Sequence, residues 1–489
     1  MEKSKLIFNN QIENKVYKKA LRNKKKYIKK YGDDSNKIYN LFSENIDSLE
    51  KYIPTKNIVT NESKEKLDFE NEKPIIIGNI RMGFGHYRIS MAIASAAIAK
   101  GYAPYWFDLH SFKETTGGKV IANLNDLYSL GSRLSQKFSL FNKFYWEPLN
   151  SEGFKKLSYN AMDQKVAELM TPIFRQLPKD IPFIATHVWP SQAAIHAGMK
   201  NVINVIPDNW PMALHLSEGA IHTVQTPSSF LGYKTLKNMD GKKILNPIPD
   251  GEIINVGHYI DHELVVNLEE DCRKRLDRIE NNKGKRFLLT VGGAGAQKEI
   301  YISIIKKLMP SIKEKKVSLY INVGDHKTFF EDLIKEIPEL AVEKNNLVYH
   351  YFDNYKKSTE FAEEALENEV SGIHIFYNKD IFAAVYITNL LMRSCDLCIT
   401  KPSELAFYPV PKLLIKRVGG HEAYGAIRAA EIGDGTIECE STDKVLQMID
   451  LILSSNEILT MFNENILKAK NIGIYDGAYK VIELAIKNR

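Results

Sequence analysis

The stretch that decides the fold is IIIGNIRMGFGHYRISMAIASAA, residues 75–97. Its three leading isoleucines predict a buried strand, and the small and apolar residues near its end recur at helical spacing. Between them lies a loop with Gly83 and Gly85, where the backbone can pass close to a ligand. The predicted helix begins at His86, where free N–H groups and the positive end of the helix dipole lie. This order places His86 at the crevice outside the carboxyl ends of a parallel sheet.

The same alternation of strand and helix continues to the end of the chain, which is typical of largely parallel sheets. Further strands are predicted at residues 103–109, 183–186, 202–206, 223–226 and 253–258. A second series is predicted at residues 287–291, 317–323, 347–350, 395–400 and 412–415. Because 489 residues exceed one ordinary core, we expect two domains. The predicted fold class is α/β, with two Rossmann-like domains facing across a cleft and a helical N-terminal extension.

Five segments follow from this pattern. Residues 1–72 are expected to be a basic helical extension and linker, and residues 73–262 the first Rossmann-like domain. A charged linker is expected over residues 263–284, followed by the second Rossmann-like domain over residues 285–470. The last segment, residues 471–489, is predicted to be a helix that packs back on the first domain.

The net charge of +6 is concentrated at the N-terminal end. Residues 1–30 hold 11 Lys and Arg against two Glu, so they carry +9 and the rest of the chain carries −3. Apolar and aromatic residues between positions 16 and 28 form one stripe of a predicted helix. Such a basic helix can lie on an anionic membrane surface. The alternative is a solvated helix whose apolar stripe packs on the protein body. Aliphatic residues between positions 41 and 53 predict a second helix.

Composition excludes several classes of protein. The hydrophobic fraction of 44% is typical of soluble globular chains, and no apolar run approaches the roughly 18 residues that span a bilayer. The first residues lack the apolar core of a secretory signal, so we expect a cytoplasmic protein. Cys395 and Cys398 form a CxxC without a second CxxC to complete a metal site. Because their surroundings predict a buried strand, we interpret both as core thiols.

Three segments of the second half are candidate phosphate or ribose sites. Residues 292–295 read GGAG at a strand-to-helix turn, where glycine N–H groups can cradle a diphosphate. They match neither the Walker loop nor GxGxxG, and a plain tight turn is the alternative. Glu422, in GGHE at 419–422, is either a favourable partner of a helix dipole or a carboxylate that accepts both hydroxyls of a ribose. Lys401 and Ser403 follow a strand and either bind phosphate or belong to a surface loop.

His86 is the leading candidate for acid–base chemistry, with a structural histidine as the alternative. A general base needs a substrate hydroxyl within hydrogen-bond reach and a pKa near neutral. Asp208, after the strand at 202–206, is the candidate second carboxylate, and His187 has a weaker case. His258 and His262 form an HxxxH that lacks the glutamate of HExxH and follows a strand. We therefore expect no metal site.

Residues from about 73 to 489 resemble glycosyltransferases of the GT-B fold. The likeness is to the group that holds monogalactosyldiacylglycerol synthase and the undecaprenyl-linked N-acetylglucosaminyltransferase. It is carried by MGFGHYRISMAIASAA at 82–97, INVGHYIDHELVVNLEEDCRKRL at 254–276, LLTVGGAGAQ at 288–297 and CDLCITKPSELAFYPVPKLLIKRVGGHEAYGAIRAAEIGDG at 395–435. This chain departs from the group at Pro402, where glycine is usual, and at His421, where glutamine is usual. Gly425 and Ala426 occupy the usual asparagine region.

The resemblance implies roles for the matching positions. His86 would be catalytic and Glu422 would hold the ribose, while Asp208 is the second catalytic candidate because of its place after a strand. The acceptor side would include Arg81, Gly83 and Gly85. The donor side would comprise Gly292, Gly293, Gly295, Lys401, Ser403, Glu404, Gly419, Gly420, His421 and Glu422.

The resemblance therefore implies a glycosyltransferase that moves a sugar from a nucleotide-diphosphate donor, above all a UDP-sugar, to a hydroxyl acceptor. The acceptor would bind residues 73–262 and the donor residues 285–470, with metal-independent inverting displacement at the anomeric carbon. No cofactor is expected, because the nucleotide sugar is a substrate, and no nucleic-acid partner is expected. A lipid acceptor, with peripheral attachment to the inner face of an anionic membrane, is a further expectation. Two alternatives stay open, namely a nucleotide-sugar epimerase on the same fold and a non-catalytic binding protein that keeps the fold.

Overall fold

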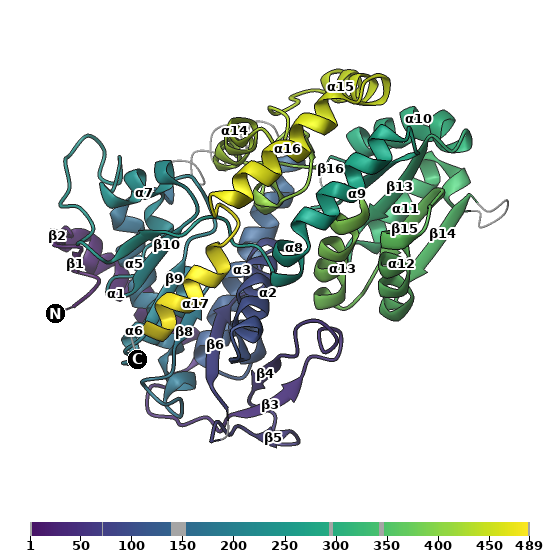
Figure 1. Ribbon diagram of the computed structural model, residues 1–489. Helices are drawn as coiled ribbons and strands as arrows, with labels where there is room; N and C mark the ends of the chain where they lie inside the picture. Colours follow the sequence, from purple (N-terminus) through teal and green to yellow (C-terminus); the bar gives the residue numbers. More distant parts are fainter. Residues whose placement is uncertain (1, 71, 138–152, 293–296, 342–346, 488–489) are drawn as a thin grey trace.

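The structure is a computed structural model that describes residues 2–70, 72–137, 153–292, 297–341 and 347–487. Two α/β lobes lie next to each other, and the last two helices run along their junction (Figure 1). Each lobe is built on its own parallel sheet. Two Rossmann-like domains joined in this way form the GT-B arrangement, which confirms the predicted fold class.

The sheet of the N-terminal lobe has nine strands in the order β11-β10-β9-β8-β6-β7-β4-β3-β5. Every pairing from β11 to β4 is parallel, whereas β3 pairs antiparallel with both β4 and β5. In chain order the strands are β3 Phe42–Asn45, β4 Lys56–Val59, β5 Glu65–Lys66, β6 Pro74–Asn79, β7 Ala103–Asp108, β8 Phe183–Ala185, β9 Val202–Val205, β10 Ile221–Val224 and β11 Ile253–Asn255.

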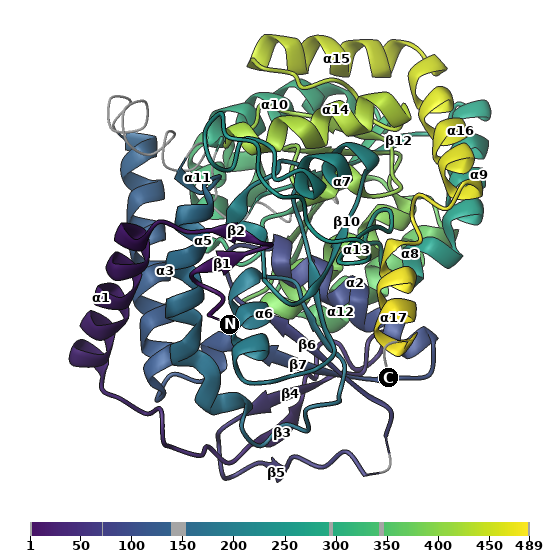
Figure 2. The same cartoon turned by 90° about the vertical axis from the view of Figure 1, so that its left-hand side faces the viewer.

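The predicted helix over residues 41–53 is wrong. This segment forms β3 and the turns after it, and it joins the sheet through β4. Its aliphatic residues Ile46, Leu49 and Ile53 are buried as expected, but in the core beside the sheet rather than along one helix. Residues 1–72 are therefore only partly a helical extension. Their one helix is α1, Asn14–Tyr31, which lies at the outer edge of the lobe against α3 and α5 (Figure 2).

Helices cover both faces of this sheet. The helix predicted after the glycine loop is α2, and its buried small residues pack against β6 and β7. The helices of this lobe are α2 Gly85–Ala99, α3 Thr116–Lys137, α5 Leu157–Ala167, α6 Val188–His196 and α7 Pro227–Lys234. A two-stranded sheet of β1 Leu6–Ile7 and β2 Asn10–Gln11 precedes α1.

The sheet of the C-terminal lobe has six parallel strands in the order β14-β15-β13-β12-β16-β17. Its strands are β12 Lys285–Thr290, β13 Val317–Asn322, β14 Val348–Phe352, β15 Gly372–Tyr377, β16 Leu397–Thr400 and β17 Lys412–Leu414. Strand β15 is absent from the sequence prediction. Cys395 and Cys398 are buried free thiols, as expected of core residues.

The helices of the C-terminal half flank this sheet and line the junction. They are α8 His262–Val266, α9 Leu268–Glu280, α10 Lys298–Lys313, α11 Lys327–Glu336, α12 Tyr355–Glu367, α13 Ile381–Ser394, α14 Ala423–Ile432, α15 Thr442–Ser454, α16 Glu457–Asn471 and α17 Gly477–Lys487. Helix α16 packs on α9, and α17 packs on α2 and β9 of the N-terminal lobe. Among the described helices, none is alone long and apolar enough to span a membrane, and α15 with α16 passes that test only as a pair bent by 89°.

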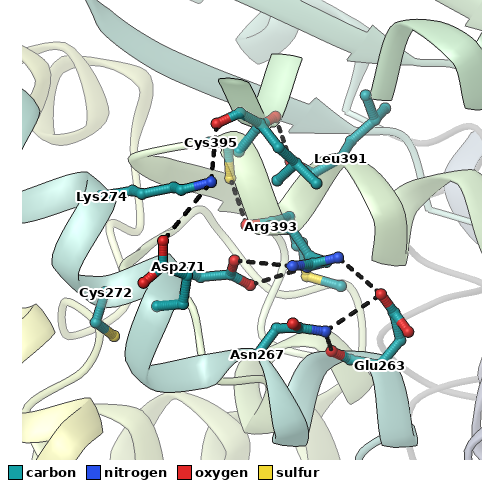
Figure 3. A network of polar contacts seen from close by, with 12 residues as sticks. Glu263, Asn267, Asp271, Cys272, Lys274, Leu391, Arg393 and Cys395 are labelled. Carbon is teal, nitrogen blue, oxygen red and sulfur yellow. Dashed lines mark hydrogen bonds and ion pairs between the residues drawn. The ribbon is translucent and has the colours of Figure 1, made fainter. Parts of the chain in front are cut away.

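The segment that crosses between the lobes is tied firmly to the C-terminal one. Arg393 of α13 donates to Asp271 of α9 at 3.1 Å and to Glu263 of α8 at 2.7 Å (Figure 3). Asn267, at the joint between α8 and α9, donates to the backbone oxygen of Glu263 at 2.8 Å. Although residues 263–284 were predicted to be a linker, their two helices are thus fixed to α13.

The lobes also share one hydrophobic core. A single cluster of buried residues includes Ile77 of β6 and Ala92 of α2 together with Leu288 of β12 and Val385 of α13. Tyr386 of the C-terminal lobe and Ile53 of the N-terminal lobe belong to the same cluster. Because burial of apolar surface stabilises contacts in proportion to the area removed from water, the junction favours a closed arrangement.

Candidate active site

The candidate site lies where the carboxyl ends of the two sheets meet. Between the lobes is a small pocket that is partly open to solvent. Its lining comes from the loop after β9 on one side and from the segments after β16 and β17 on the other, namely Pro207, Asp208, Asn209, Pro402, Ser403, Glu404, Phe407, His421, Glu422 and Gly425. The structure thus brings predicted residues of both lobes to one pocket.

His86 lies in the first turn of α2 and is held in one orientation by the backbone. Its Nδ1 lies 2.6 Å from the carbonyl oxygen of Thr186, so Nδ1 carries the proton and Nε2 is left as an acceptor. Burial lowers the pKa of His86, and the Thr186 carbonyl and the charges of Glu404 and Asp208 offset only part of that effect. At neutral pH the imidazole is therefore uncharged, as a general base requires.

His187 has a structural role beside it. The two imidazole rings meet edge to face with their centroids 4.8 Å apart. His187 Nδ1 accepts the backbone N–H of Trp189 at 3.1 Å and so caps the start of α6. Its ring restricts the space around His86 without occupying the acceptor nitrogen of His86.

Asp208 is kept ionised by a neighbour that sequence reasoning missed. His215 Nε2 lies 3.4 Å from Asp208 Oδ2, and His215 Nδ1 lies 2.6 Å from the hydroxyl of Tyr233. Burial by itself raises the pKa of Asp208, but the hydrogen bond from His215 outweighs it, helped by the imidazoles of His421 and His86, which are protonated at the low pH where this carboxyl titrates. The pKa of Asp208 is therefore held well below its usual range. Asp208 is thus a permanent negative charge at the pocket, and His215 positions it. No sequence signal identified His215, which lies seven residues beyond Asp208 at the end of a short 3-10 helix, Ala213–His215.

Glu404 reaches across the junction to the start of α2. A Cβ atom added to Gly85 would lie 1.9 Å from Glu404 Oε1, so a larger residue there would push the Glu404 carboxylate away from α2. The charge of Glu404 acts on His86, and within the described chain no residue donates a hydrogen bond to its carboxylate. Glu404, predicted on the donor side, therefore lies beside the predicted base of the other lobe.

Arg81 and Phe84 of the glycine loop contact the other lobe, although Arg81 and Gly83 remain exposed. Arg81 Nη2 lies 2.5 Å from Asp325 Oδ2 in the loop after β13. The ring of Phe84 packs on that of His326 at a centroid distance of 5.5 Å. Gly83 has φ +74° and no neighbouring atom where a Cβ would lie, so its backbone conformation alone favours glycine. The strand-end rule that selected Asp208 would also have selected Asp325 and His326.

The predicted ribose ligand is already engaged in the structure. One carboxylate oxygen of Glu422 pairs with the ammonium group of Lys401. The other accepts the backbone N–H of Val418 at 2.7 Å and that of Gly419 at 3.3 Å, which caps the turn before α14. The charge of Lys401 and these hydrogen bonds overcome burial and lower the pKa of Glu422. A ribose would have to share or displace these partners.

The remaining donor-side residues fall into two groups. Gly292 lies near the ion pair of Lys401 and Glu422, because a Cβ atom added to Gly292 would lie 2.9 Å from Lys401 Cε. Ser403, Gly420 and His421 lie on the same side of the pocket. Gly293 and Gly295 lie outside the described residues, so their predicted contact with phosphate stays a prediction.

His258 and His262 do not converge on one point. His258 Nδ1 bonds to the carbonyl oxygen of Phe407 at 2.8 Å, and His262 Nδ1 bonds to the hydroxyl of Tyr479 at 2.6 Å. In the described part of the chain, no group of three His, Cys, Asp or Glu residues is placed to hold a metal ion.

Two family models match the chain, one on each lobe. Residues 6–235 match the model described as "Domain of unknown function (DUF6937)", and residues 248–486 match "Domain of unknown function (DUF6938)". The gap between the two matches precedes β11, the last strand of the N-terminal sheet. No curated protein matches the sequence.

Solved structures with a similar arrangement have low sequence identity. The UDP-GlcNAc 2-epimerase from Neisseria meningitidis bound to UDP-GlcNAc is 13% identical, with a TM-score of 0.43 over 85% of this chain and 100% of that one. The UDP-GlcNAc 2-epimerase from Methanocaldococcus jannaschii is 10% identical, with a TM-score of 0.41 over 85% and 99%. A glycosyltransferase from Rickettsia africae is 11% identical, with a TM-score of 0.40 over 86% and 99%. At this level the similarity says nothing about activity, and the fold rests on the sheet topology.

Proposed function

We propose that this protein is a glycosyltransferase that uses a nucleotide-diphosphate sugar, with UDP as the expected nucleotide. The observation that carries the proposal is the composition of the pocket between the lobes. Asp208 of the N-terminal lobe, an ionised carboxylate, lines this pocket together with predicted donor-binding residues of the C-terminal lobe. The imidazole of His86 lies beside the pocket, near enough to Asp208 and Glu404 to be affected by their charges.

In the proposed reaction His86 Nε2 takes the proton of an acceptor hydroxyl. The acceptor oxygen bonds to the anomeric carbon while the bond from that carbon to the diphosphate breaks, and the configuration inverts. Asp208 stabilises the positive charge that His86 gains, since it stays ionised. Lys401, whose ammonium group pairs with Glu422, lies beside the predicted phosphate turn and would turn from Glu422 toward the charge of the leaving diphosphate. Closure of the lobes excludes water and limits hydrolysis.

A nucleotide-sugar epimerase is the second candidate, because acid–base groups of the two lobes lie close to each other beside the pocket. Glu404 comes from one lobe and His86 from the other, and an epimerase needs two such groups on opposite sides of one carbon. A non-catalytic binding protein is the third candidate, since Glu422 already has partners for both oxygens.

Calorimetric titration with UDP and UDP-sugars, followed by product analysis, separates the three. Release of UDP only when a hydroxyl acceptor is present supports the transferase. Interconversion of two UDP-sugars without an acceptor supports the epimerase, and absence of nucleotide binding supports the third candidate.

His86→Asn is the decisive variant, with His350→Asn as its matched control. The imidazole of His350 bonds to the carbonyl oxygen of Leu340 at 2.7 Å, on the edge strand β14 of the other lobe. We expect His86→Asn to keep UDP binding and to lower turnover by about 10²–10⁴-fold. Equal turnover by the two variants would remove His86 from the mechanism.

A further inference from the structure

The outward face of α1 is a continuous cationic surface, here named the basic ridge. It comprises the exposed side chains Lys15, Lys18, Lys19, Arg22, Lys25, Lys26, Lys29 and Lys30. The helix contains no Asp or Glu from Asn14 to Tyr31. At 1.5 Å per residue the ridge is about 22 Å long. Residues three and four apart face each other on a helix, so the ridge places like charges side by side, which destabilises the helix.

The described part of the chain places no carboxylate against the ridge. Within the described residues, none of its eight side chains lies within ion-pair distance of a carboxylate. Lys24, on the inner face of the same helix, is the contrast, because its ammonium group lies 2.6 Å from Glu168 Oε2. Like charges in a row lower the stability of the helix, and residues that lower stability in this way are expected at functional surfaces. The missing partner is therefore an anionic surface.

The apolar stripe of α1 is not available to that partner. Ala20 is fully buried, and Val16, Tyr27 and Ile28 pack on the hydrophobic clusters of the N-terminal lobe beside α5. A helix that inserts into a membrane interface needs its apolar face free to enter the acyl region. The structure thus excludes the inserted form of the predicted amphipathic helix as long as α1 stays docked, and leaves binding by charge alone.

The residue types on the ridge favour lipid headgroups over nucleic acid. Seven of its eight cations are lysines, which act as compact point charges, whereas the planar fork of arginine suits specific recognition of nucleic acid. The tyrosines of α1, at positions 17, 27 and 31, are all partly buried and offer no exposed platform on which bases could stack. The ridge also lies at the outer edge of the molecule, where a flat surface can reach it (Figure 2).

We propose that the basic ridge docks this protein on the surface of an anionic membrane by charge and without insertion. The proposal does not depend on the glycosyltransferase reaction, because the ridge and the pocket share no residue. Clusters of lysine attract anionic lipids additively and only within a Debye length of the surface. Binding should therefore need anionic lipid and should be lost as salt is raised.

Vesicle co-sedimentation of the full chain tests this proposal. The vesicles are phosphatidylcholine alone or with about one third phosphatidylglycerol, at low and at several-fold higher salt. The variant Lys18→Glu/Lys25→Glu/Lys29→Glu reverses three charges of the ridge, and Lys306→Glu/Lys313→Glu/Lys379→Glu reverses three exposed lysines of the other lobe. The ridge substitutions place acids beside lysines, so the thermal stability of that variant should be unchanged or higher.

We expect the wild type and the control variant to bind anionic vesicles and the ridge variant to lose at least about tenfold in affinity. No binding to anionic vesicles at low salt would overturn the proposal, as would equal binding by the two variants. Binding to pure phosphatidylcholine, or binding that resists salt, would overturn it in favour of insertion. Ridge-dependent binding to duplex DNA or RNA without binding to vesicles would overturn it in favour of nucleic acid.

Discussion

At the scale of single residues, the environment of His86 predicts the pH dependence of the proposed activity. Burial lowers its pKa below the ordinary value of about 6.5, so the imidazole is already unprotonated at pH 7. The acidic limb of the kcat/KM profile should therefore lie below pH 6.5, and activity should not rise further between pH 7 and 8. In His86→Asn this limb should disappear along with most of the rate. A limb centred above pH 7 would exclude His86 as the base.

A second residue, Asp163, predicts a pH dependence of stability instead. Asp163 lies on α5, where burial raises its pKa to about 8, and among described residues Oδ2 has no hydrogen-bond partner. The folded protein keeps this proton up to about pH 8, whereas the unfolded chain releases it near pH 3.9. The stability from the neutral group is therefore complete below pH 3.9 and is lost as pH rises toward 8.

Asp163→Asn should remove this dependence, because the amide does not ionise. The free energy of unfolding of the wild type, measured by urea denaturation, should fall relative to that of the variant by ~1.4 kcal/mol per pH unit between pH 5 and 8. Above pH 8 the difference should level off. Parallel curves for the two proteins across this range would show that Asp163 is ionised in the folded state.

At the scale of elements, the sequence was sufficient where burial alone decides the structure. Strands β6 and β13 are buried along their whole length and β12 is buried from Arg286 on, and mainly apolar runs predicted each of them. Strand β3 has the polar sequence Phe-Ser-Glu-Asn and exists because it pairs with β4, so no local pattern marks it. The Ile-His-Ile-Phe-Tyr run of β15 has the β-branched and aromatic residues typical of a strand, although the sequence prediction does not include it.

The residues of the site divide in the same way, into those that the local sequence predicts and those that only the folded chain brings together. Chain direction places the residue after each parallel strand at one edge of the sheet, so Asp208, Lys401 and Ser403 could be predicted. The pairing of Arg81 with Asp325 across the lobes could not be predicted, because the two residues are 244 positions apart and only the packing of the lobes brings them together. No local sequence motif indicates that Glu422 forms an ion pair with Lys401.

The buried ion pair that strand β17 forms with Asp434 predicts how substitutions there change stability. Lys412 Nζ lies 2.8 Å from Asp434 Oδ2, both side chains are fully buried, and the hydroxyl of Tyr475 donates to the same carboxylate at 2.9 Å. Lys412→Met leaves a buried carboxylate without its cation, which should cost about 3–5 kcal/mol of unfolding free energy. Lys412→Met/Asp434→Asn should recover much of that loss, and Tyr475→Phe should cost only about 1 kcal/mol. Additive losses in the double variant, measured by urea denaturation, would contradict this interpretation.

At the scale of the whole molecule, the two chain crossings between the lobes depend on each other. The outgoing segment around Gly257 and the returning segment before α17 form a bridge between Tyr259 and Asp476. Within it, the backbone N–H of His258 donates to the oxygen of Ile474 at 2.6 Å. The crossings are thus paired like two strands, and a change in one should move the other.

Gly257 tests this coupling, with Gly251 as a matched control. Both have positive φ, +94° and +81°, so alanine at either should cost about 1–2 kcal/mol of backbone strain. A Cβ at Gly251 would meet nothing within 4 Å, but at Gly257 it would lie 2.6 Å from the carbonyl oxygen of Ile474. Since the crossings must separate to admit that methyl group, Gly257→Ala should lose a further ~1–3 kcal/mol of unfolding free energy. Gly257→Ala should also make the two crossing segments sensitive to limited proteolysis, and Gly251→Ala should not. If both variants lose the same unfolding free energy in urea denaturation, the two crossings move independently.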